Sequence, residues 1–290
     1  MNQQHRPHSR TGLQVRAAGR SDTGRVREQN EDAIALCEPP GKALLATLGR
    51  LYLLADGAGG HAAGEVASKT AVETIASTYY EQMASTASPR QTFDARNEAS
   101  HLHGPLPDLD LPLRRIQHTF FAAHTRILEL AARQEQYRGM ATTCVAAVVK
   151  GTHLLIAHIG DSRAYLIQSS SKAPPTLTRL TVDHSMVTAL AQAGVIAPEQ
   201  VHTLPSRHII LRALGGNRQD NPDPDITTCR IQAGDYLVLC CDGLWRMLTE
   251  EQMATVVSKN SPQAACDRLV GLANEAGGED NISVVVLSFT

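Results

Sequence analysis

Four aspartates in this sequence lie at the borders of short apolar runs. They are Asp56, Asp161, Asp242 and Asp280, of which the first three follow a run and the last precedes one. Apolar runs of this length, bounded by Gly and polar residues, predict buried β-strands. The four carboxylates can therefore meet at one end of an antiparallel sheet, where they repel one another unless a hard divalent cation neutralises them. The pattern indicates a metal-dependent hydrolase of phosphate esters.

Each of these positions also has an ordinary structural interpretation. Asp56 opens the sequence Asp-Gly-Ala-Gly-Gly-His, in which the aspartate could simply cap a helix after a tight turn, or Gly57 could offer its carbonyl as a ligand. Asp161 stands in Gly-Asp-Ser-Arg, a composition that is common in turns between strands. Asp242 is more informative, because the apolar strand before it brings its carboxylate close to the core.

A charged cluster at residues 27–32 precedes a predicted strand. Such clusters are usually solvated turns, but Arg27 has the planar guanidinium that can hold a phosphate with two parallel hydrogen bonds. Glu31 or Asp32 from the same cluster could add an oxygen to the metal site.

Composition and charge narrow the function class. The chain has 290 residues, 42% of them hydrophobic, and a formal charge of −2, so we expect a large folded core and neither nucleic acid nor a membrane as partner. No apolar stretch approaches the length of a membrane helix or a signal core, which favours a cytoplasmic protein. The six cysteines form no Cys-x-x-Cys pair and are expected to be reduced and structural. Cys240 and Cys241 are neighbours in a strand, so their side chains should face opposite sides and one could lie near the metal site.

The predicted elements describe an α+β fold. Strands are expected at 34–37, 43–47, 51–55, 142–149, 154–159, 163–167, 236–241 and 282–289. Helical periodicity predicts helices over 65–83 and 113–134, and capping signals at Thr249 and Ser261 predict two more. We therefore expect a central β-sandwich of two antiparallel sheets, flanked by helix pairs in α-β-β-α layers. Residues 1–11 are expected to be a flexible tail before a domain over 12–290, with a surface insert at 84–112 and a flap region at 182–214.

The motifs resemble, as an ordered set, a known enzyme family. They are Arg27–Asp32, Asp56–Ser68, Gly139–Thr143, Gly160–Tyr165, Val182–Ser185, Leu211–Gly215, Cys241–Trp245 and Gly277–Asn281. Each is modest alone, but together and in this order they resemble the bacterial form of the PPM family, the type 2C metal-dependent Ser/Thr protein phosphatases. The resemblance covers roughly the whole of residues 12–290 and implies hydrolysis of phosphoserine and phosphothreonine by a metal-activated water.

The resemblance also implies roles for individual residues. Asp56 would bridge two Mn²⁺ or Mg²⁺ ions, Gly57 would offer its carbonyl, and Asp242 and Asp280 would hold the first ion. Glu31 would support the second ion, Asp161 would join Asp242 at a weaker third one, and Arg27 would bind the phosphate of the substrate. The catalytic set is thus Arg27, Asp56 and Asp242. Phosphorylated proteins, with a cognate bacterial Ser/Thr kinase, are the implied partners of a monomeric enzyme.

The sequence departs from the family pattern in a few places. Ala58 stands where the family usually has Met, and His61 comes later in the loop and need not reach the leaving group, so it is not assigned as a general acid. Two alternatives remain: another two-metal enzyme, such as a nuclease or nucleotide cyclase, and a phosphatase-like scaffold without activity. The chain charge disfavours the nuclease, and the presence of all the implied metal ligands disfavours the scaffold.

Overall fold

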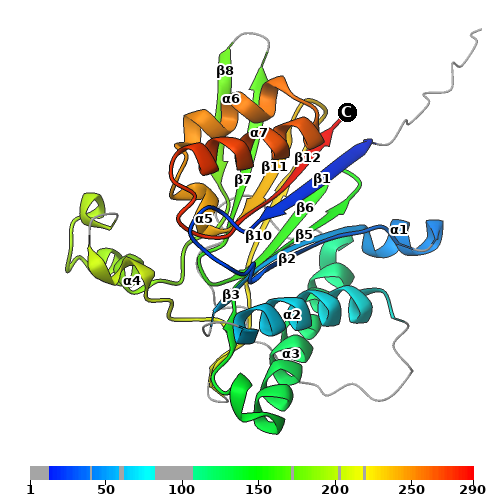
Figure 1. The fold of residues 1–290 in the computed structure, drawn as a ribbon. Coiled ribbons are helices and arrows are strands. Elements are labelled where there is room, and N and C mark those ends of the chain that lie inside the picture. Colours follow the sequence, from blue (N-terminus) through cyan, green and yellow to red (C-terminus); the bar gives the residue numbers. More distant parts are fainter. Residues whose placement is uncertain are drawn as a thin grey trace, which may run out of the picture.

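In the computed structural model, two antiparallel sheets pack face to face and helices cover both outer faces (Figure 1). The structure describes residues 13–39, 41–58, 62–81, 107–170, 173–201, 204–217 and 220–290. The two sheets and the helices on their outer faces confirm the four expected layers, α-β-β-α. The expected tail at 1–11, most of the insert at 84–112 and His61 lie outside the described residues.

The first sheet has the strand order β1-β12-β11-β7-β8. Its strands are β1 (Val15–Asp22), β7 (Arg163–Ser170), β8 (Ala173–Arg179), β11 (Tyr236–Cys240) and β12 (Ile282–Phe289). Helices α6 (Glu250–Lys259) and α7 (Pro262–Glu275) cover its outer face, as Figure 1 shows. The short helix α5 (Asp242–Trp245) follows β11 directly.

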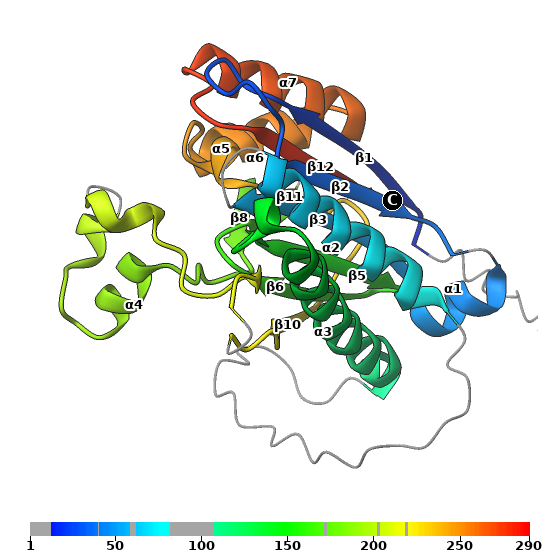
Figure 2. The same ribbon diagram turned by 60° about the horizontal axis from the view of Figure 1, so that its bottom comes forward.

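The second sheet has the order β10-β6-β5-β3-β4-β9, and β2 pairs with β3 beside this path. Its strands are β2 (Asp32–Cys37), β3 (Arg50–Ala58), β4 (Ala141–Thr142), β5 (Cys144–Lys150), β6 (His153–Ile159), β9 (Leu214–Gly215) and β10 (Asp225–Arg230). Helices α2 (Ala62–Tyr80) and α3 (Asp110–Arg133) lie across its outer face, which Figure 2 shows from below. Strand β2 is preceded by the charged cluster and followed by helix α1 (Lys42–Leu48).

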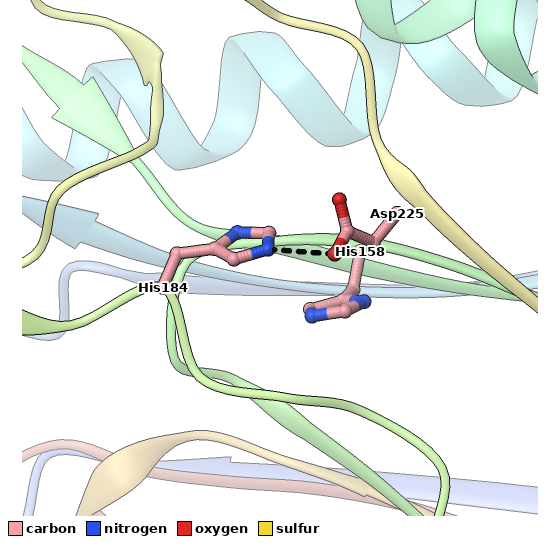
Figure 3. A group of neighbouring side chains, drawn as sticks. All are labelled: His158, His184 and Asp225. Atoms are coloured by element: carbon pink, nitrogen blue, oxygen red, sulfur yellow. Dashed lines mark ion pairs between the residues drawn. The ribbon is translucent and has the colours of Figure 1, made fainter. Parts of the chain in front are cut away.

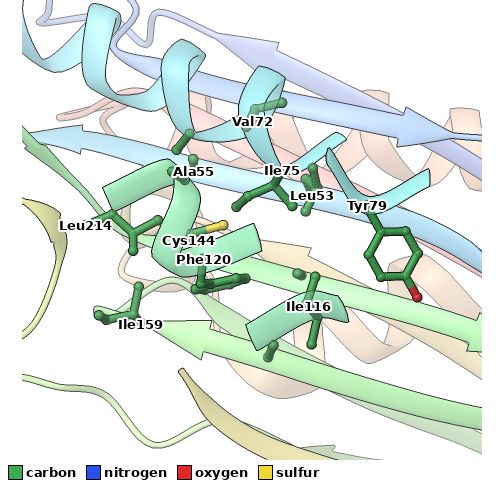
Figure 4. Close-up of a cluster of buried hydrophobic side chains, with 14 of the residues drawn as sticks. Leu53, Ala55, Val72, Ile75, Tyr79, Ile116, Phe120, Cys144, Ile159 and Leu214 are labelled. Atoms are coloured by element: carbon green, nitrogen blue, oxygen red, sulfur yellow. The ribbon is translucent and has the colours of Figure 1, made fainter. Parts of the chain in front are cut away.

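The core is divided by the two-residue alternation of the strands. In β3, Tyr52 and Leu54 point into the space between the sheets, whereas Leu51 and Leu53 point toward α2 and α3. Figure 4 shows the helix-side cluster, in which Phe120 of α3 and Ile75 of α2 pack over the sheet. Because the central strands are covered on both faces, they read as continuous apolar runs, which is why they could be predicted.

The helix signals at the C-terminal end are confirmed in detail. Thr249 Oγ1 accepts a hydrogen bond from the Gln252 N–H (3.2 Å), and Gln252 Oε1 accepts one from the Thr249 N–H (2.8 Å), so the capping box forms. Ser261 caps α7 through the Ala264 N–H, with Pro262 in the first turn. Beyond the helix, Gly278 has φ 55°, a conformation that favours glycine and ends α7 just before Asp280.

The expected strand at 43–47 is wrong, because this segment is helix α1. Its sequence, Lys-Ala-Leu-Leu-Ala-Thr-Leu, consists almost wholly of good helix formers, and Gly49 ends the helix with φ 77°. The last residues of the expected insert also differ, since 107–109 form a 3₁₀ turn and α3 begins at Asp110. The 182–214 segment does consist of short pieces, namely α4 (Met186–Gln192) and 3₁₀ turns at Pro198–Gln200 and Pro205–His208.

Candidate active site

The four aspartates found in the sequence converge at one end of the sandwich. Asp56 lies near the end of β3 and Asp161 just after β6, while Asp242 begins α5 and Asp280 stands two residues before β12. The pKa of Asp56 is raised well above its usual value by burial and by the charges of Asp32, Asp242, Asp161 and Asp280. The second sheet and the first sheet thus each contribute carboxylates to one group.

Asp32 also belongs to this group of carboxylates. It is paired directly opposite Asp56 in the β2–β3 register, and the ligand atoms of Asp32, Asp56 and Cys241 lie within 4.8 Å of one another. Burial raises the pKa of Asp32 to about 7, and nearby Ser283 and Cys241 offset only part of that effect. By distance and angle, neither carboxylate oxygen of Asp32 makes a hydrogen bond to any described residue.

This arrangement fits divalent cations. Buried carboxylate oxygens without hydrogen-bond donors carry a large desolvation cost, which a cation with oxygen ligands removes. Burial and the charges of Asp242 and Asp183 also raise the pKa of Asp161 to about 7, although the charges of Arg246 and Arg163 oppose this shift. Cys241 is a poor ligand by comparison, since burial raises the pKa of its thiol well above the usual value.

Cys240 and Cys241 behave as expected for adjacent residues of a strand. Cys240 packs toward α6 and α7, whereas Cys241 faces the space between the sheets next to the carboxylates. All six cysteines are free. Cys240 therefore belongs to the core under the helices, and Cys241 borders the site.

Glycines allow three backbone segments to approach closely beside Asp56. The Gly57 N–H donates to the Glu31 carbonyl (3.1 Å), and a Cβ on Gly57 would lie 2.2 Å from the Gly64 carbonyl oxygen. A Cβ on Gly64 would lie 2.1 Å from Glu31 Oε2, so the Glu31 carboxylate rests against the first turn of α2. Glu31 is thus adjacent to Asp56 and Gly57, on the opposite side from Asp32.

Asn281 fixes the loop that carries Arg27 and Glu31. Its Oδ1 accepts the Glu31 N–H (2.8 Å), and its Nδ2 donates to the carbonyls of Thr23 (3.0 Å) and Gln29 (2.9 Å). The residue after Asp280 therefore holds the N-terminal loop against the start of β12. Arg27 Nη2 completes the connection with an ion pair to Asp280 Oδ2 at 2.8 Å.

A pocket of about 220 Å³ lies beside these carboxylates. It is lined by Arg27, His208, Gly243, Arg246, Met247, Glu279 and Asp280. The Arg27 side chain is 52% exposed and is therefore available to a ligand. A larger hollow of about 620 Å³ is lined only by residues of α2 and α3, and none of the site carboxylates borders it.

Arg246 and His208 were not anticipated from the sequence. Arg246 stands four residues after Asp242, a spacing that brings its Nη2 to 2.9 Å from Asp242 Oδ2. His208 comes from the 182–214 segment, and its Nδ1 accepts from Arg246 Nη1 at 2.6 Å. The helical spacing of Asp242 and Arg246 was a usable signal, whereas the tertiary contact with His208 left none.

A second polar cluster lies where the 182–214 segment joins the core (Figure 3). His158 of β6 stacks on His184 with ring centroids 4.7 Å apart, and His184 Nε2 lies 3.2 Å from Asp225 Oδ2. The Gly160 N–H donates to His184 Nδ1 at 3.1 Å, and His184 Nε2 also lies 3.0 Å from Arg212 Nη1. Arg212 Nη1 pairs with Asp225 Oδ1 at 2.7 Å, so the positive charge in this cluster is the guanidinium of Arg212. The cluster therefore anchors the segment to the core.

Comparison with known proteins agrees with this geometry. A family profile described as protein phosphatase 2C matches residues 22–270. The chain belongs to the protein phosphatase 2C family. It is 34% identical over 278 residues to the Mycobacterium tuberculosis protein named serine/threonine protein phosphatase PstP, covering 96% of this chain but only 46% of that protein. It is 33% identical to the Listeria innocua serine/threonine phosphatase stp, covering 94% of this chain and 95% of that one.

Solved structures lead to the same assignment. The catalytic domain of PstP, determined with two manganese ions, has a TM-score of 0.71 and 31% identity, over 96% of this chain and 99% of that one. Membership in the 2C family and these structures confirm the expected α+β sandwich and the protein phosphatase class. They also exclude the nuclease and cyclase alternatives.

Proposed function

We propose that this chain removes phosphate from phosphoserine and phosphothreonine in proteins, with Asp56, Asp242 and Asp280 as the carboxylates that hold two divalent cations. The supporting observation is the convergence of these side chains, with Asp32, at one end of the sandwich, where burial and mutual repulsion raise the pKa of Asp56. In this proposal the Gly57 carbonyl and Glu31 would complete the ligand set, which is supported by the position of the Glu31 carboxylate against Gly64 in the first turn of α2. Mn²⁺ and Mg²⁺ both suit such oxygen ligands.

Cations held by these residues would supply an activated water and polarise the phosphoryl oxygens. The residues of the chain provide the rest. Arg27 is exposed in the pocket beside Asp280, where its guanidinium is suited to bind two phosphoryl oxygens and orient the phosphorus. Asn281 holds the Arg27 loop in place through two main-chain carbonyls and the Glu31 N–H. Catalysis on this proposal depends on positioning and charge, with no covalent intermediate on the enzyme.

The biological setting follows from the same proposal. The substrates are phosphorylated proteins, and a Ser/Thr kinase that acts on the same proteins is the natural opposing partner in a signalling pathway. We propose a monomer in the cytoplasm, and the charge of −2 gives no reason to expect nucleic acid or an anionic membrane as partner. None of the described helices is long and apolar enough to cross a bilayer. The 182–214 segment, which adds His208 to the pocket, is proposed as the flap over the substrate.

The test compares the wild type with Asp242→Asn. The wild type should hydrolyse an aryl phosphate and a phosphothreonine peptide only with added Mn²⁺ or Mg²⁺, and a chelator should abolish turnover. Loss of a ligand charge should lower kcat on the order of 10²-fold or more. Asp267→Asn is the matched control, because Asp267 pairs with Arg20 on the surface away from the site. Full activity of Asp242→Asn in chelator would refute the metal assignment.

A further inference from the structure

The guanidinium of Arg246 lies between two carboxylates of the site. Its Nη2 is 2.9 Å from Asp242 Oδ2 and 3.7 Å from Asp161 Oδ2. Asp161 and Asp242 are the pair expected to hold a weaker third cation. A positively charged nitrogen of the chain already lies between the oxygens that such an ion would use.

Several contacts hold Arg246 in this position. Its side chain is only 18% exposed, and Nη1 donates to His208 Nδ1 at 2.6 Å. Its guanidinium carbon lies 5.1 Å from the ring centroid of Trp245, within the range of a cation–π interaction. The Trp245 indole in turn donates to the Asp161 carbonyl oxygen at 3.0 Å, so Arg246 and Asp161 are fixed to the same ring. An exposed arginine could move aside for an ion, whereas this one is held by three neighbours.

A divalent cation and this guanidinium cannot share the two carboxylates. A cation needs oxygen ligands at about 2.0–2.6 Å, which is closer than the guanidinium allows while Nη2 stays between the oxygens. The two positive charges would also repel each other in a partly buried site, where screening by water is weak.

We propose that Arg246 takes the place of the third cation, so that this phosphatase works with two ions and a guanidinium. Arg246 is a positioning residue: it neutralises Asp161 and holds Asp242 oriented toward the two core ions. This inference rests on the proposed metal site and extends it. Activity should therefore saturate with Mn²⁺ in a single step, without the additional weak step that a third ion would give.

Counting bound Mn²⁺ tests the proposal directly. Free Mn²⁺ is measured by its electron paramagnetic resonance signal during titration of the wild type, Arg246→Met and Arg246→Lys. We expect two ions per chain for the wild type and for Arg246→Lys, which keeps a positive charge. Arg246→Met should bind a third, weaker ion, and the double variant Arg246→Met/Asp161→Asn should return to two.

Trp245 provides an independent readout, because it is the only tryptophan of the chain and lies beside Asp161. Paramagnetic Mn²⁺ at the new site should add a second quenching step to its fluorescence in Arg246→Met alone. Three ions in the wild type would overturn the inference, and so would only two in both Arg246→Met and a second variant, Arg246→Gln. A wild type that binds no Mn²⁺ would instead refute the proposed function, and this inference with it.

Discussion

Gly243 sets the separation between Asp242 and Asp280, and Gly243→Ala should show this. A Cβ on Gly243 would lie 2.0 Å from the Asn281 carbonyl oxygen and 3.4 Å from Asp280 Cβ. Cβ contacts below 3.0 Å essentially never occur, so α5 and the 280–281 backbone must separate by at least about 1.0 Å. The displacement falls directly between the two aspartates that are proposed to hold the first ion.

The expected cost has two parts. Forcing a methyl group into this buried contact should lower the free energy of unfolding by about 1–3 kcal/mol. A displacement of about 1 Å between groups that act on one phosphate should lower kcat roughly 10²-fold. Mn²⁺ affinity should fall as well, because the two carboxylates no longer face one ion. Calorimetric Mn²⁺ titration, aryl phosphate turnover and thermal unfolding measure these three effects.

Gly271→Ala is the matched control. Gly271 lies inside α7, and an added Cβ there meets nothing within 4 Å. The change should leave turnover and Mn²⁺ affinity unaltered and should stabilise the protein by roughly 0.5–1 kcal/mol, because glycine is a poor helix former. If folded Gly243→Ala keeps the wild-type turnover and Mn²⁺ affinity, the close approach of α5 to Asn281 does not set the metal geometry.

Three further changes probe other parts of the molecule. Arg27→Ala should lose about 1.5–3 kcal/mol of transition-state binding, measured as kcat/KM with an aryl phosphate. A kcat/KM within about twofold of the wild type would show that Arg27 does not bind the phosphate. His158 has its pKa lowered from 6.5 to about 4 by burial. Between pH 4 and pH 6.5 the unfolded chain therefore binds more protons at His158 than the folded protein does. The free energy of unfolding should fall by at most about 3 kcal/mol as pH drops from 6.5 to 4. His158→Gln should lack this pH dependence when unfolding is measured with denaturant. Substitution of the exposed Gln192 or Glu199 by Ala should alter KM for a phosphopeptide more than turnover of an aryl phosphate; equal loss of both would contradict a gating flap.

The central strands and their aspartates could be predicted because burial on both faces leaves a strong pattern. β3, β6, β11 and β12 are apolar runs, and their borders fix where the carboxylates emerge. Edge elements left weaker patterns. β1 and β10 mix polar residues with Ala and Thr, and β8 contains two prolines that only an edge strand accommodates.

The site itself was only partly readable from the sequence. The choice between Glu31 and Asp32 depended on which neighbour faced the core, and strand pairing placed Asp32 opposite Asp56 while Glu31 turned to α2. Contacts between distant segments, such as Arg246 with His208, arise only when the chain is folded. Spacing along a strand or helix is encoded locally, whereas the partner across a pocket is not.

The pairing of β1 with β12 determines when during synthesis this enzyme can acquire activity. Val15 lies opposite Phe289, and the Arg27–Asp280 pair joins residues that are 253 positions apart. Such long-range contacts make folding slow, because a large loop must close before any contact compensates for the lost chain entropy. A nascent chain that has been translated only as far as residue 279 holds Arg27, Glu31 and Asp56 but lacks Asp280 and Asn281. The proposed site therefore cannot be complete until residues 280–289 have been made and β12 has paired with β1.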